Sequence, residues 1–578
     1  MQSFAELVEQ LEHCRGTRAK VQTLAAYFGN TPPAEAAWAL HVLLGNQRKR
    51  LITGRRLRQI CLQDTPLPQW LFDDCYSHVG DSAETIALLW HQVGDLVAGA
   101  SDGSTPDATS TAQSLQVWME QLLPAAAALA DDEQAIAVRR LWQGLTPQQL
   151  LVANKLLTGG LRIGVAQGLV VKALSQHSGL DEPLIQHRLM GGFLPTATAF
   201  EALLADEHVH QLVPSQPYPF FLASPLQLAP ASTPESAQPA SPLPGEAHQW
   251  QAEWKWDGIR GQLIRRSGQS YLWSRGEELL HDAFPELIHA ASSLPDGTVL
   301  DGEVIIWPAG ADQPAPFNAL QRRLGRKKPG PKLLGECPAA FVAYDLLEWG
   351  GDDWRQRPLS QRRSALESLI QTLPEATPTP AAGLLRLSQR LTLEAWEQLE
   401  PLRQRAREAG AEGLMLKALD SPYLVGRKRG SWWKHKLDPY TLDAVLLYAQ
   451  AGSGRRANLF TDYTFGLWEG SAAAGSKAGD DAGVPPRLVS FAKAYSGLDD
   501  GEITALDRWI RSHTIERFGP VRSVEPLQVF ELAFEGIQRS SRHKSGIAVR
   551  FPRISRWRRD KPASEADSLA TALALLEG

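Results

Sequence analysis

A lysine near the middle of the chain stands in a pattern that could carry out nucleophilic chemistry. The run reads Glu253-Trp254-Lys255-Trp256-Asp257-Gly258-Ile259-Arg260. A neutral lysine amine can attack phosphorus, an aspartate can orient the amine or hold a metal ion, and an arginine can grip a phosphate. The alternative is a surface β-turn with Asp-Gly at its tip. The pattern alone leaves both interpretations open.

Two other kinds of side chain in the sequence suit a nucleotide. Glu303 lies in the apolar run 300–306, and Glu412 precedes the apolar run 413–416. Two carboxylates at strand ends that face one cavity could hold Mg²⁺ and a ribose hydroxyl. Lys434 and Lys436 alternate, so a strand would present both on one face, which suits a triphosphate. Each run alone also fits a solvated strand or turn.

Length and composition indicate a multidomain protein. The 578 residues exceed one hydrophobic core and suggest three or four domains. No apolar run approaches the roughly 18–20 residues of a membrane span, and the amphipathic N-terminus does not read as a secretory signal. The four cysteines are scattered, without a C-x-x-C pair, which favours an intracellular, cytoplasmic protein over a disulfide framework or zinc site. We expect a monomer. A net charge of −5 argues against indiscriminate binding of nucleic acid.

Periodicity divides the chain into an all-α region, an α+β region and a β-rich region. Residues 1–215 show helical spacing, and Thr146-Pro147 is a helix start. Residues 216–249 are rich in proline and serine and predict a linker or lead-in. The α+β domain spans 250–437, with helices expected at 283–293, 360–372 and 392–409. Residues 438–578 predict a small barrel such as an OB-fold, with a solvated loop at 470–483 and a final helix at 563–576.

Several basic or glycine-rich stretches could contact a nucleic acid backbone. The helix ending at Thr158 is followed by a turn in which Gly160 and Gly164 flank Arg162, and such a turn can offer N–H groups and a cation to a phosphodiester. An ordinary helix hairpin is the alternative. Arg322 and Arg323 belong to one basic cluster, Arg427 to a second, and residues 539–561 to a third. Cations concentrated in three patches favour a nucleic-acid clamp over a solvated surface.

In combination these runs resemble the ATP-dependent DNA ligases of the covalent nucleotidyltransferase superfamily. The run 155–165 resembles the helical DNA-binding domain of the larger eukaryotic and archaeal replicative ligases, and the chain resembles a bacterial three-domain member. Six segments resemble the family's motifs I, III, IIIa, IV, V and VI in order; they are Lys255–Arg260, Leu300–Ile306, Phe341–Leu347, Glu412–Lys417, Trp433–Lys436 and Arg550–Lys561.

The resemblance implies a role for each matching residue. Lys255 would attack the α-phosphorus of ATP and form lysyl-AMP, with Asp257 beside it. Glu253 would contact the adenine, Tyr344 would stack on it, and Lys434 and Lys436 would neutralise the α-phosphate. Arg260, Arg275 and Glu303 would contact the ribose and phosphate. Asp257, Glu303 and Glu412 would bind metal. Arg556, Arg558 and Lys561 would orient the pyrophosphate.

The implied substrates are ATP with Mg²⁺, or Mn²⁺, and nicked double-stranded DNA, in repair, replication or recombination. The family's second step moves AMP to the 5′-phosphate of the nick, and the 3′-hydroxyl then displaces it. Because motif VI lies in a separate domain, that domain would have to close on the nucleotide and later swing away. An RNA ligase, a capping-type nucleotidyltransferase and a catalytically inactive DNA clamp are the alternatives. An NAD-dependent ligase would need a four-cysteine zinc module, which the sequence lacks.

Overall fold

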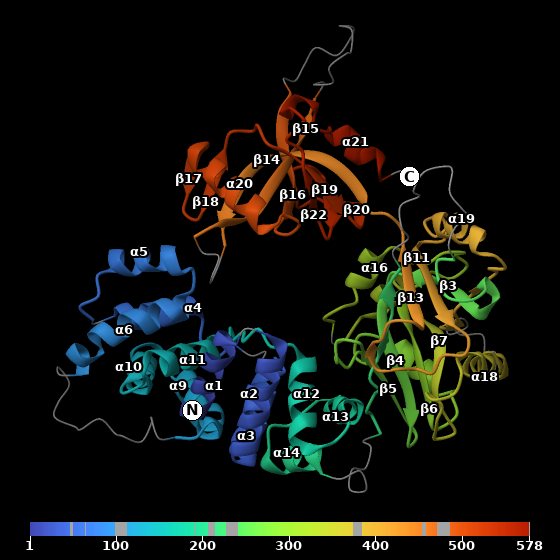
Figure 1. Ribbon diagram of the computed structural model, residues 1–578, viewed down its shortest axis with the longest axis horizontal. Coiled ribbons are helices and arrows are strands. Elements are labelled where there is room, and N and C mark those ends of the chain that lie inside the picture. The colour runs from blue at the N-terminus through green and yellow to red at the C-terminus, as the bar shows by residue number, and fades with distance from the viewer. Residues whose placement is uncertain are drawn as a thin grey trace. The chain divides into compact units, whose positions relative to one another are not determined.

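The computed structural model describes most of the chain (Figure 1). Its description leaves out residues 15, 47–49, 64, 99–112, 191, 206–213, 227–240, 327, 374–383, 453–457, 471–485 and 577–578. Residues 227–240 of the predicted linker and nearly all of the predicted loop 470–483 therefore lie outside the described residues. Among the described helices, none is long and apolar enough to cross a membrane.

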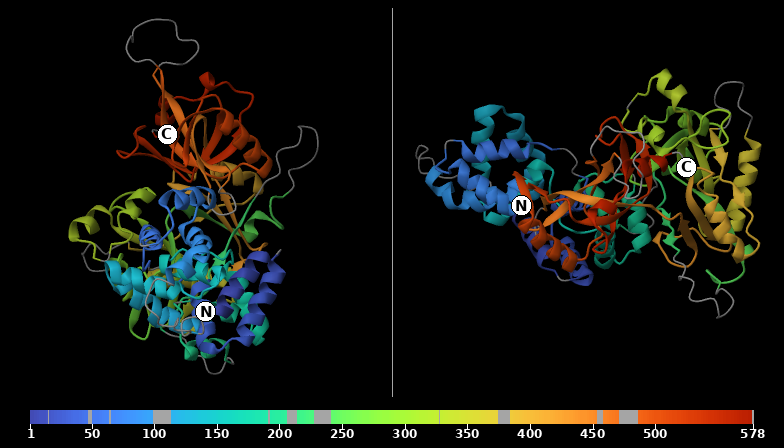
Figure 2. Two further views of the ribbon diagram at one scale, coloured as in Figure 1. Left: turned by 90° about the vertical axis from the view of Figure 1, so that its left-hand side faces the viewer. Right: turned by 90° about the horizontal axis from the view of Figure 1, so that it is seen from above.

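Element types change along the chain as the periodicity predicts. The views in Figure 2 show helices up to residue 204, a mixed region after it, and mainly strands from residue 440. Contacts divide the chain into two compact units. One contains residues 1–13, 45–164 and 438–578, and the other contains residues 14–44 and 165–437. The predicted helical domain 1–215 is thus shared between the two units.

Pairing between helices distant in sequence explains this division. In one unit α1 packs on α11, and α4 and α5 pack on α6. In the other unit α2 packs on α12, and α3 packs on α14. The first set comprises α1 (Gln2–His13), α4 (Gly54–Leu62), α5 (Gln69–Val79), α6 (Ser82–Ala98), α8 (Leu115–Val117), the π-helical turn η1 (Trp118–Leu122), α9 (Leu123–Ala128), α10 (Asp131–Trp142) and α11 (Pro147–Thr158). The second set comprises α2 (Thr17–Asn30), α3 (Pro33–Leu43), α12 (Gln167–Ser178), α13 (Glu182–Leu189) and α14 (Ala197–Leu204).

Helix α11 begins and ends at local sequence signals. Thr146 caps its first turn, and the Thr146 N–H donates to the side-chain oxygen of Gln149 at 2.9 Å. At the other end Gly159 takes a left-handed conformation, with φ of 64°. The Gly160 N–H then donates to the Lys155 carbonyl at 3.0 Å, which completes a glycine C-cap. The predicted helix start at Thr146-Pro147 is confirmed.

The central domain, residues 214–437, is built from two β-sheets. One sheet has the strand order β10-β3-β11-β13-β2, and the other runs β5-β4-β6-β7-β8, with β9 parallel to β7. The chain crosses from the first sheet to the second between β3 and β4, at Asp257-Gly258. A Cβ on Gly258 would lie 2.4 Å from the Val304 carbonyl oxygen, so only glycine fits this crossing.

The central domain's elements alternate between strands and short helices. They are β1 (Phe221–Leu222), β2 (Ser224–Pro225), η3 (Ala247–Gln249), β3 (Trp250–Trp256), β4 (Ile259–Arg266), β5 (Gln269–Ser274), α15 (Pro285–Ala291), β6 (Thr298–Ile306), α16 (Phe317–Gln321), α17 (Pro331–Glu336), β7 (Ala339–Trp349), β8 (Asp352–Asp353), α18 (Leu359–Thr372), β9 (Leu385–Leu387), β10 (Arg390–Leu391), η4 (Trp396–Gln398), α19 (Leu399–Gln404), β11 (Ala411–Ala418), β12 (Gly426–Arg427) and β13 (Trp432–Lys436).

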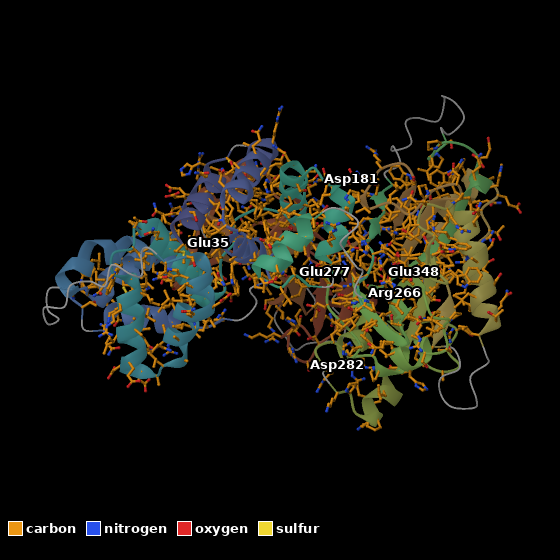
Figure 3. All side chains as sticks on the ribbon, turned by 90° about the horizontal axis from the view of Figure 1, so that it is seen from below. Glu35, Asp181, Arg266, Glu277, Asp282 and Glu348 are labelled. Carbon is orange, nitrogen blue, oxygen red and sulfur yellow. The ribbon has the colours of Figure 1, made fainter. Side chains whose placement is uncertain are left out.

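The described start of the predicted lead-in is an integral part of the central domain. Strand β1 pairs with β12, and β2 pairs with β13. The Tyr218 hydroxyl donates to Glu348 at 2.7 Å, and Arg266 forms an ion pair with the same carboxylate at 2.6 Å (Figure 3). Burial raises the pKa of the Tyr218 hydroxyl well above its usual range, and the Glu348 charge adds to this. Residues 216–226 therefore pack as structure and differ from the linker that composition predicted.

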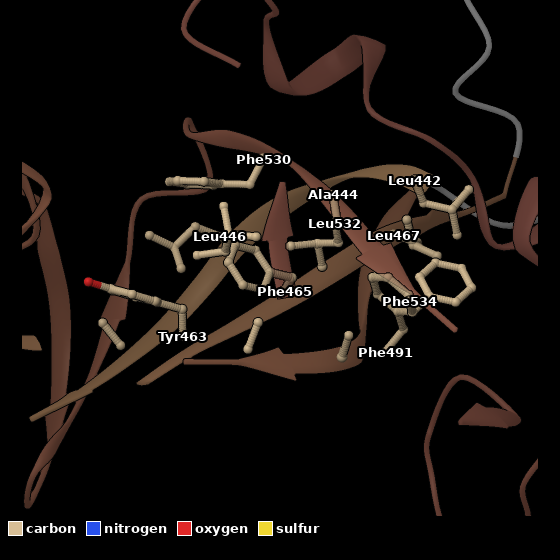
Figure 4. Packing of buried hydrophobic residues seen from close by; sticks show 14 of the residues in the cluster. Leu442, Ala444, Leu446, Tyr463, Phe465, Leu467, Phe491, Phe530, Leu532 and Phe534 are labelled. Atoms are coloured by element: carbon tan, nitrogen blue, oxygen red, sulfur yellow. The ribbon is translucent and has the colours of Figure 1, made fainter. Parts of the chain in front are cut away.

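The C-terminal β domain, residues 438–578, has one highly connected sheet. Its order is β16-β15-β14-β18-β17, with β19 paired to β14 and β22, and β20–β21 form a separate hairpin. Large apolar side chains fill its interior, including Phe465, Phe530 and Phe534 (Figure 4). Its elements are β14 (Tyr440–Ala451), β15 (Phe460–Glu469), β16 (Arg487–Ala494), α20 (Asp500–Ser512), β17 (Thr514–Phe518), β18 (Val521–Val524), β19 (Val529–Phe534), β20 (Gly536–Arg539), β21 (Ile547–Arg550), β22 (Arg553–Trp557), η6 (Ala563–Glu565) and α21 (Leu569–Ala574).

Two predicted helices are shorter than expected. The helix predicted at 392–409 is the turn η4 followed by the short α19, and the helix predicted at 563–576 is η6 and α21 separated by three residues. Ser568 ends the interruption, because its side chain caps α21 by accepting from Thr571 N–H. Apolar spacing alone does not reveal such a cap in the middle of a periodic run.

Candidate active site

A cavity of about 290 Å³ lies in the central domain. Eight residues predicted to hold a nucleotide line it: Glu253, Lys255, Arg260, Arg275, Glu303, Tyr344, Lys434 and Lys436. Its other walls come from Leu222, Ala223, Trp254, Trp256, Met415, Lys417, Arg427 and Trp432. The structure thus brings residues of motifs I, III, IIIa, IV and V to one place.

Strand alternation explains why these side chains meet. Residues two apart on a strand share a face, and so do residues directly opposite each other on neighbouring strands. Glu253 on β3 lies opposite Met415 on β11, and Met415 lies opposite Lys434 on β13. The shared face therefore continues through Lys255 on β3 and Lys436 on β13. One face of three strands supplies the lysines and the carboxylate together.

The candidate nucleophile is held by a carboxylate from a distant strand. The Lys255 amine donates to Glu412, and Lys436 lies 3.4 Å from the same carboxylate oxygen. Burial by itself would raise the pKa of Glu412, but Lys255 and Lys436 hold it below its ordinary value, and a hydrogen bond from Asp257 adds to this. Asp257 is therefore linked to Lys255 only indirectly, because both side chains interact with Glu412. It does not line the cavity itself.

Glu253 lies deep in the cavity and is surrounded by donors. Its side chain is 2% exposed, and its Oε1 accepts from Lys417 at 2.8 Å and from Gln251 at 2.6 Å. Its Oε2 accepts from the Ser388 hydroxyl at 2.8 Å. The Lys417 ammonium also lies 4.3 Å from the centre of the Tyr344 ring. The predicted adenine contact and the predicted stacking ring are therefore joined by one lysine.

Arg260 is bound within the protein more tightly than the sequence suggests. Its guanidinium makes two hydrogen bonds to Asp301, at 2.7 and 3.2 Å, and one to the Phe221 carbonyl at 2.6 Å. Asp301 is fully buried and also accepts from the Tyr423 hydroxyl at 2.7 Å. Arg260 therefore forms part of the cavity wall, with little donor capacity left for a phosphate.

The cavity shifts the pKa of two further groups. Burial raises the pKa of Glu303 to about 8, although Lys255 and Arg260 oppose the shift. Burial also lowers the pKa of the Lys434 amine, and the nearby charges of Lys255 and Arg427 lower it further. The cavity has an excess of positive charge around Lys434, which suits an anionic ligand.

The three residues predicted to bind metal do not form a ready-made metal cage. Within the described part of the chain, no group of three or more His, Cys, Asp and Glu side chains is arranged to hold an ion. Glu412 is paired with Lys255 and Lys436, and burial raises the pKa of Glu303 to about 8. The prediction that Asp257, Glu303 and Glu412 each ligate a metal ion stays a prediction. A magnesium ion carried by ATP phosphates needs only one or two carboxylates, and Glu412 fits that smaller role.

The motif VI cations lie in the C-terminal β domain. Arg558 and Lys561 both donate to Oδ2 of Asp443, at 2.9 and 2.8 Å. Arg556 is more exposed and pairs with Asp560 at 3.5 Å. Asp443 lies on β14, and the adjacent strand β19 joins β14 to β22. Two of the three predicted pyrophosphate contacts are thus fixed by one buried aspartate.

The residues predicted to bind DNA differ in exposure and in the partners they already have. Arg162 is exposed, but the Gly160 N–H is already used in the cap of α11. Arg322 is exposed and pairs with Glu336. Arg323 is fully buried, with two hydrogen bonds to Glu286 at 2.7 and 2.9 Å, so the prediction of a DNA contact by this residue is wrong. A charge run in sequence does not show which cation turns inward.

The remaining DNA-binding predictions concern Gly164 and Arg427. Gly164 has a φ of 62°, a left-handed conformation that favours glycine. Arg427 lines the nucleotide cavity.

Lys417 was not predicted as a site residue. It lies two positions after Met415 on an apolar strand, so the two side chains share a face, and this spacing was a signal that could have identified Lys417. Trp432 was missed because nothing local distinguishes it from the neighbouring Trp433.

A cavity lined by lysines, carboxylates and an aromatic ring is typical of a nucleotide-binding enzyme, in which Lys255 remains the predicted nucleophile. Family comparison agrees with this class. Residues 238–436 match the family described as "ATP dependent DNA ligase domain", and residues 1–175 match "DNA ligase N terminus". The chain belongs to the ATP-dependent DNA ligases, and the family resemblance read from the six motifs is confirmed.

Individual relatives support the same family. A probable DNA ligase of Koribacter versatilis is 31% identical over 99% of this chain and 96% of its own length. A probable DNA ligase of Opitutus terrae is 32% identical over 98% of this chain, which spans 62% of that longer relative. The solved structure titled "Pmar-Lig_Pre." has a TM-score of 0.53 at 15% identity and covers 96% of this chain and 99% of its own, which shows a shared fold.

Proposed function

We propose that this ligase seals nicks in duplex DNA that carry a 5′-phosphate beside a 3′-hydroxyl, with Lys255 as the covalent intermediate's attachment point. The observation that carries the proposal is the position of Lys255. Its amine faces a cavity with Lys434 and Lys436, and it is held there by Glu412. An RNA ligase shares such a pocket, but the match of residues 1–175 to a DNA ligase N-terminal family favours DNA.

In the first step the Lys255 nitrogen attacks the α-phosphorus of ATP. The new P–N bond forms as the bond to pyrophosphate breaks, and the amine loses its protons to Glu412 or solvent. Lys434 and Lys436 neutralise charge on the α-phosphate, since both lie on the face of β13 that lines the cavity. Glu253 and Tyr344 hold the base. Arg275 and Glu303 hold the ribose and phosphate.

The second and third steps use DNA. A 5′-phosphate oxygen attacks the lysyl-AMP phosphorus, which breaks the P–N bond and returns a neutral amine. The 3′-hydroxyl oxygen then attacks the 5′-phosphate, AMP leaves, and the strand is continuous. Positioning and charge neutralisation are the main devices for such transfers.

The proposed division of labour places DNA binding in the other domains. Arg162 and the turn that follows α11 contact the phosphodiester backbone, together with Arg322. The C-terminal β domain acts as an OB-fold that approaches the nucleotide for the first step, when Arg556, Arg558 and Lys561 orient pyrophosphate. Mg²⁺, bound to ATP phosphates beside Glu412, would supply charge neutralisation in this step.

The proposal is tested by incubating the protein with α-labelled ATP and Mg²⁺, and then with nicked duplex. We expect a covalent protein–AMP adduct that disappears as the nick is sealed. Lys255→Ala should abolish the adduct completely, because no other amine occupies that position. The matched control is Lys428→Ala, a lysine in the basic run that precedes β13 and outside the cavity lining. An adduct that persists in Lys255→Ala would overturn the mechanism.

A further inference from the structure

The recognition of the purine base depends on a residue outside the expected nucleotide contacts. We propose that Lys417 is a specificity-determining residue: it fixes Glu253 as a hydrogen-bond acceptor, so that the cavity takes a 6-aminopurine and rejects a 6-oxopurine. This inference rests on the proposed function, because it concerns the nucleotide that Lys255 attacks. It adds the reason why ATP is preferred over nucleotides of similar size.

The ion pair between Lys417 and Glu253 is almost completely buried. The two side chains are 1% and 2% exposed, and their charged atoms are 2.8 Å apart. They come from strands β11 and β3, and they lie 164 positions apart in sequence. Lys417 also packs against two rings, with its ammonium 4.3 Å from the centre of Tyr344 and 4.6 Å from that of Trp432. It can therefore move little.

The donors around Glu253 decide what its carboxylate can offer a ligand. Each carboxylate oxygen has capacity for about two hydrogen bonds. Lys417 and Gln251 occupy Oε1, whereas Oε2 accepts from Ser388 and keeps one accepting direction. An acceptor suits the exocyclic amine of adenine. It repels the carbonyl oxygen at the same position of hypoxanthine or guanine, because both groups are then acceptors.

Removal of the Lys417 charge should change the chemical character of Glu253. A buried carboxylate without a counter-charge takes up a proton, because burial disfavours the charged form. A protonated carboxyl has one O–H donor, which can pair with a 6-oxo group. Lys417 thus excludes the wrong base indirectly, through the protonation and orientation of Glu253.

The test compares ATP with ITP, which carries an oxygen in place of the 6-amino group. Labelled covalent adduct is measured against nucleotide concentration for the wild type, Lys417→Met, Lys417→Arg, Glu253→Gln and the double variant Glu253→Gln/Lys417→Met. We expect the wild type to prefer ATP by about a hundredfold or more. Lys417→Met should lower this preference by at least about tenfold, mainly through a higher KM for ATP, and Lys417→Arg should restore much of it.

The double variant separates specificity from general damage. A carboxamide both donates and accepts, so Glu253→Gln alone should lose the preference, and adding Lys417→Met should lower it no further. A further fall in the double variant would show that Lys417 does not act through Glu253. An equal loss of activity on ATP and ITP in Lys417→Met would show that Lys417 has only a structural role. Either result overturns the inference.

A second variant covers the case in which Lys417→Met does not fold, judged by its thermal unfolding. Lys417→Gln removes the charge of Lys417 and keeps a hydrogen-bond donor beside Glu253. It should lower the preference for ATP over ITP, with little change in the maximal rate of adduct formation, and an unchanged preference would overturn the inference. A wild type that forms no adduct with either nucleotide would instead refute the proposed function.

Discussion

Charged side chains in the nucleotide cavity are paired across long stretches of sequence. Lys255 meets Glu412, Glu253 meets Lys417, and Arg260 meets the buried Asp301. Two of these pairs join β3 to β11 and the third joins β4 to β6, so each functional group is oriented before a ligand arrives. Such fixed groups need little rearrangement at the moment of reaction, which is the condition under which electrostatic stabilisation is most effective.

Glu303 makes the stability of the free protein depend on pH. Its pKa is raised by burial from an ordinary 4.5 to about 8, so the folded protein holds this proton more tightly than the unfolded chain. The resulting stabilisation is complete below the unfolded pKa and is lost as pH rises through the folded pKa. Without nucleotide or metal, the unfolding temperature attributable to the central domain should fall between about pH 4.5 and 8.

The variant Glu303→Gln should remove that part of the pH dependence, because its amide does not titrate. Thermal unfolding at several pH values measures the effect. Glu397→Gln is the matched control, since Glu397 is exposed in the same domain and should behave like the wild type. If the wild type and Glu303→Gln lose stability in parallel over this range, Glu303 is not the group responsible.

At the scale of elements, β14 holds the end of β22 in place for chemistry. Asp443 on β14 binds both Arg558 and Lys561, which follow β22 directly. The backbone N–H of Asp443 in turn donates to Asp567 at 2.7 Å, so the aspartate is itself fixed. The two cations are therefore positioned by a strand that lies far from motif VI in sequence.

Asp443→Asn should slow the formation of the protein–AMP adduct by roughly ten- to a hundredfold, because a small displacement of orienting groups has that effect on phosphoryl transfer. Sealing of nicked DNA that already carries AMP on its 5′-phosphate should be unchanged, since that reaction releases no pyrophosphate. Rates of the two reactions measure the effect separately. Asp462→Asn is the control, as its ion pair with Lys493 lies elsewhere in the same domain. Equal slowing of both reactions would contradict the assignment.

At the scale of the whole molecule, adduct formation should be separable from DNA sealing. All residues that line the cavity lie between 222 and 436. A chain that begins at Pro214 keeps the contacts of Pro214, Ser215 and Gln216 with the central domain. We expect this truncated chain to form the protein–AMP adduct but to seal nicks poorly at physiological salt, because it lacks the helices to which we assign binding of the phosphate backbone.

Sealing assays over a range of salt concentrations measure this loss, with the circular dichroism spectrum as a check on folding. The truncated Lys255→Ala variant is the control for background labelling. The DNA-binding role of residues 1–213 would be refuted if the truncated and complete chains sealed nicks equally well at physiological salt.

Local patterns were informative wherever one strand or one helix end decides the outcome. The alternation of Lys434 and Lys436 predicted a shared face, as the structure has it, and in β3 Glu253 and Lys255 share that face too. The cap of α11 followed from Thr146 in the same way. The prediction from a longer apolar run was less reliable, because Ser568 interrupts the predicted final helix. Composition was also less reliable, since the predicted linker contains β1 and β2 within residues 216–226.

The sequence by itself determined the family, the order of the motifs and the predicted nucleophile, because residue type and spacing along a strand are local properties. Only the tertiary structure decided which charges remain available. In the structure Arg323 is buried in an ion pair with Glu286, Arg260 pairs with Asp301, and Lys417 pairs with Glu253. Such pairings depend on which strands and helices become neighbours. The period of a strand specifies the face on which a side chain lies, but it does not specify the partner that the opposite element brings.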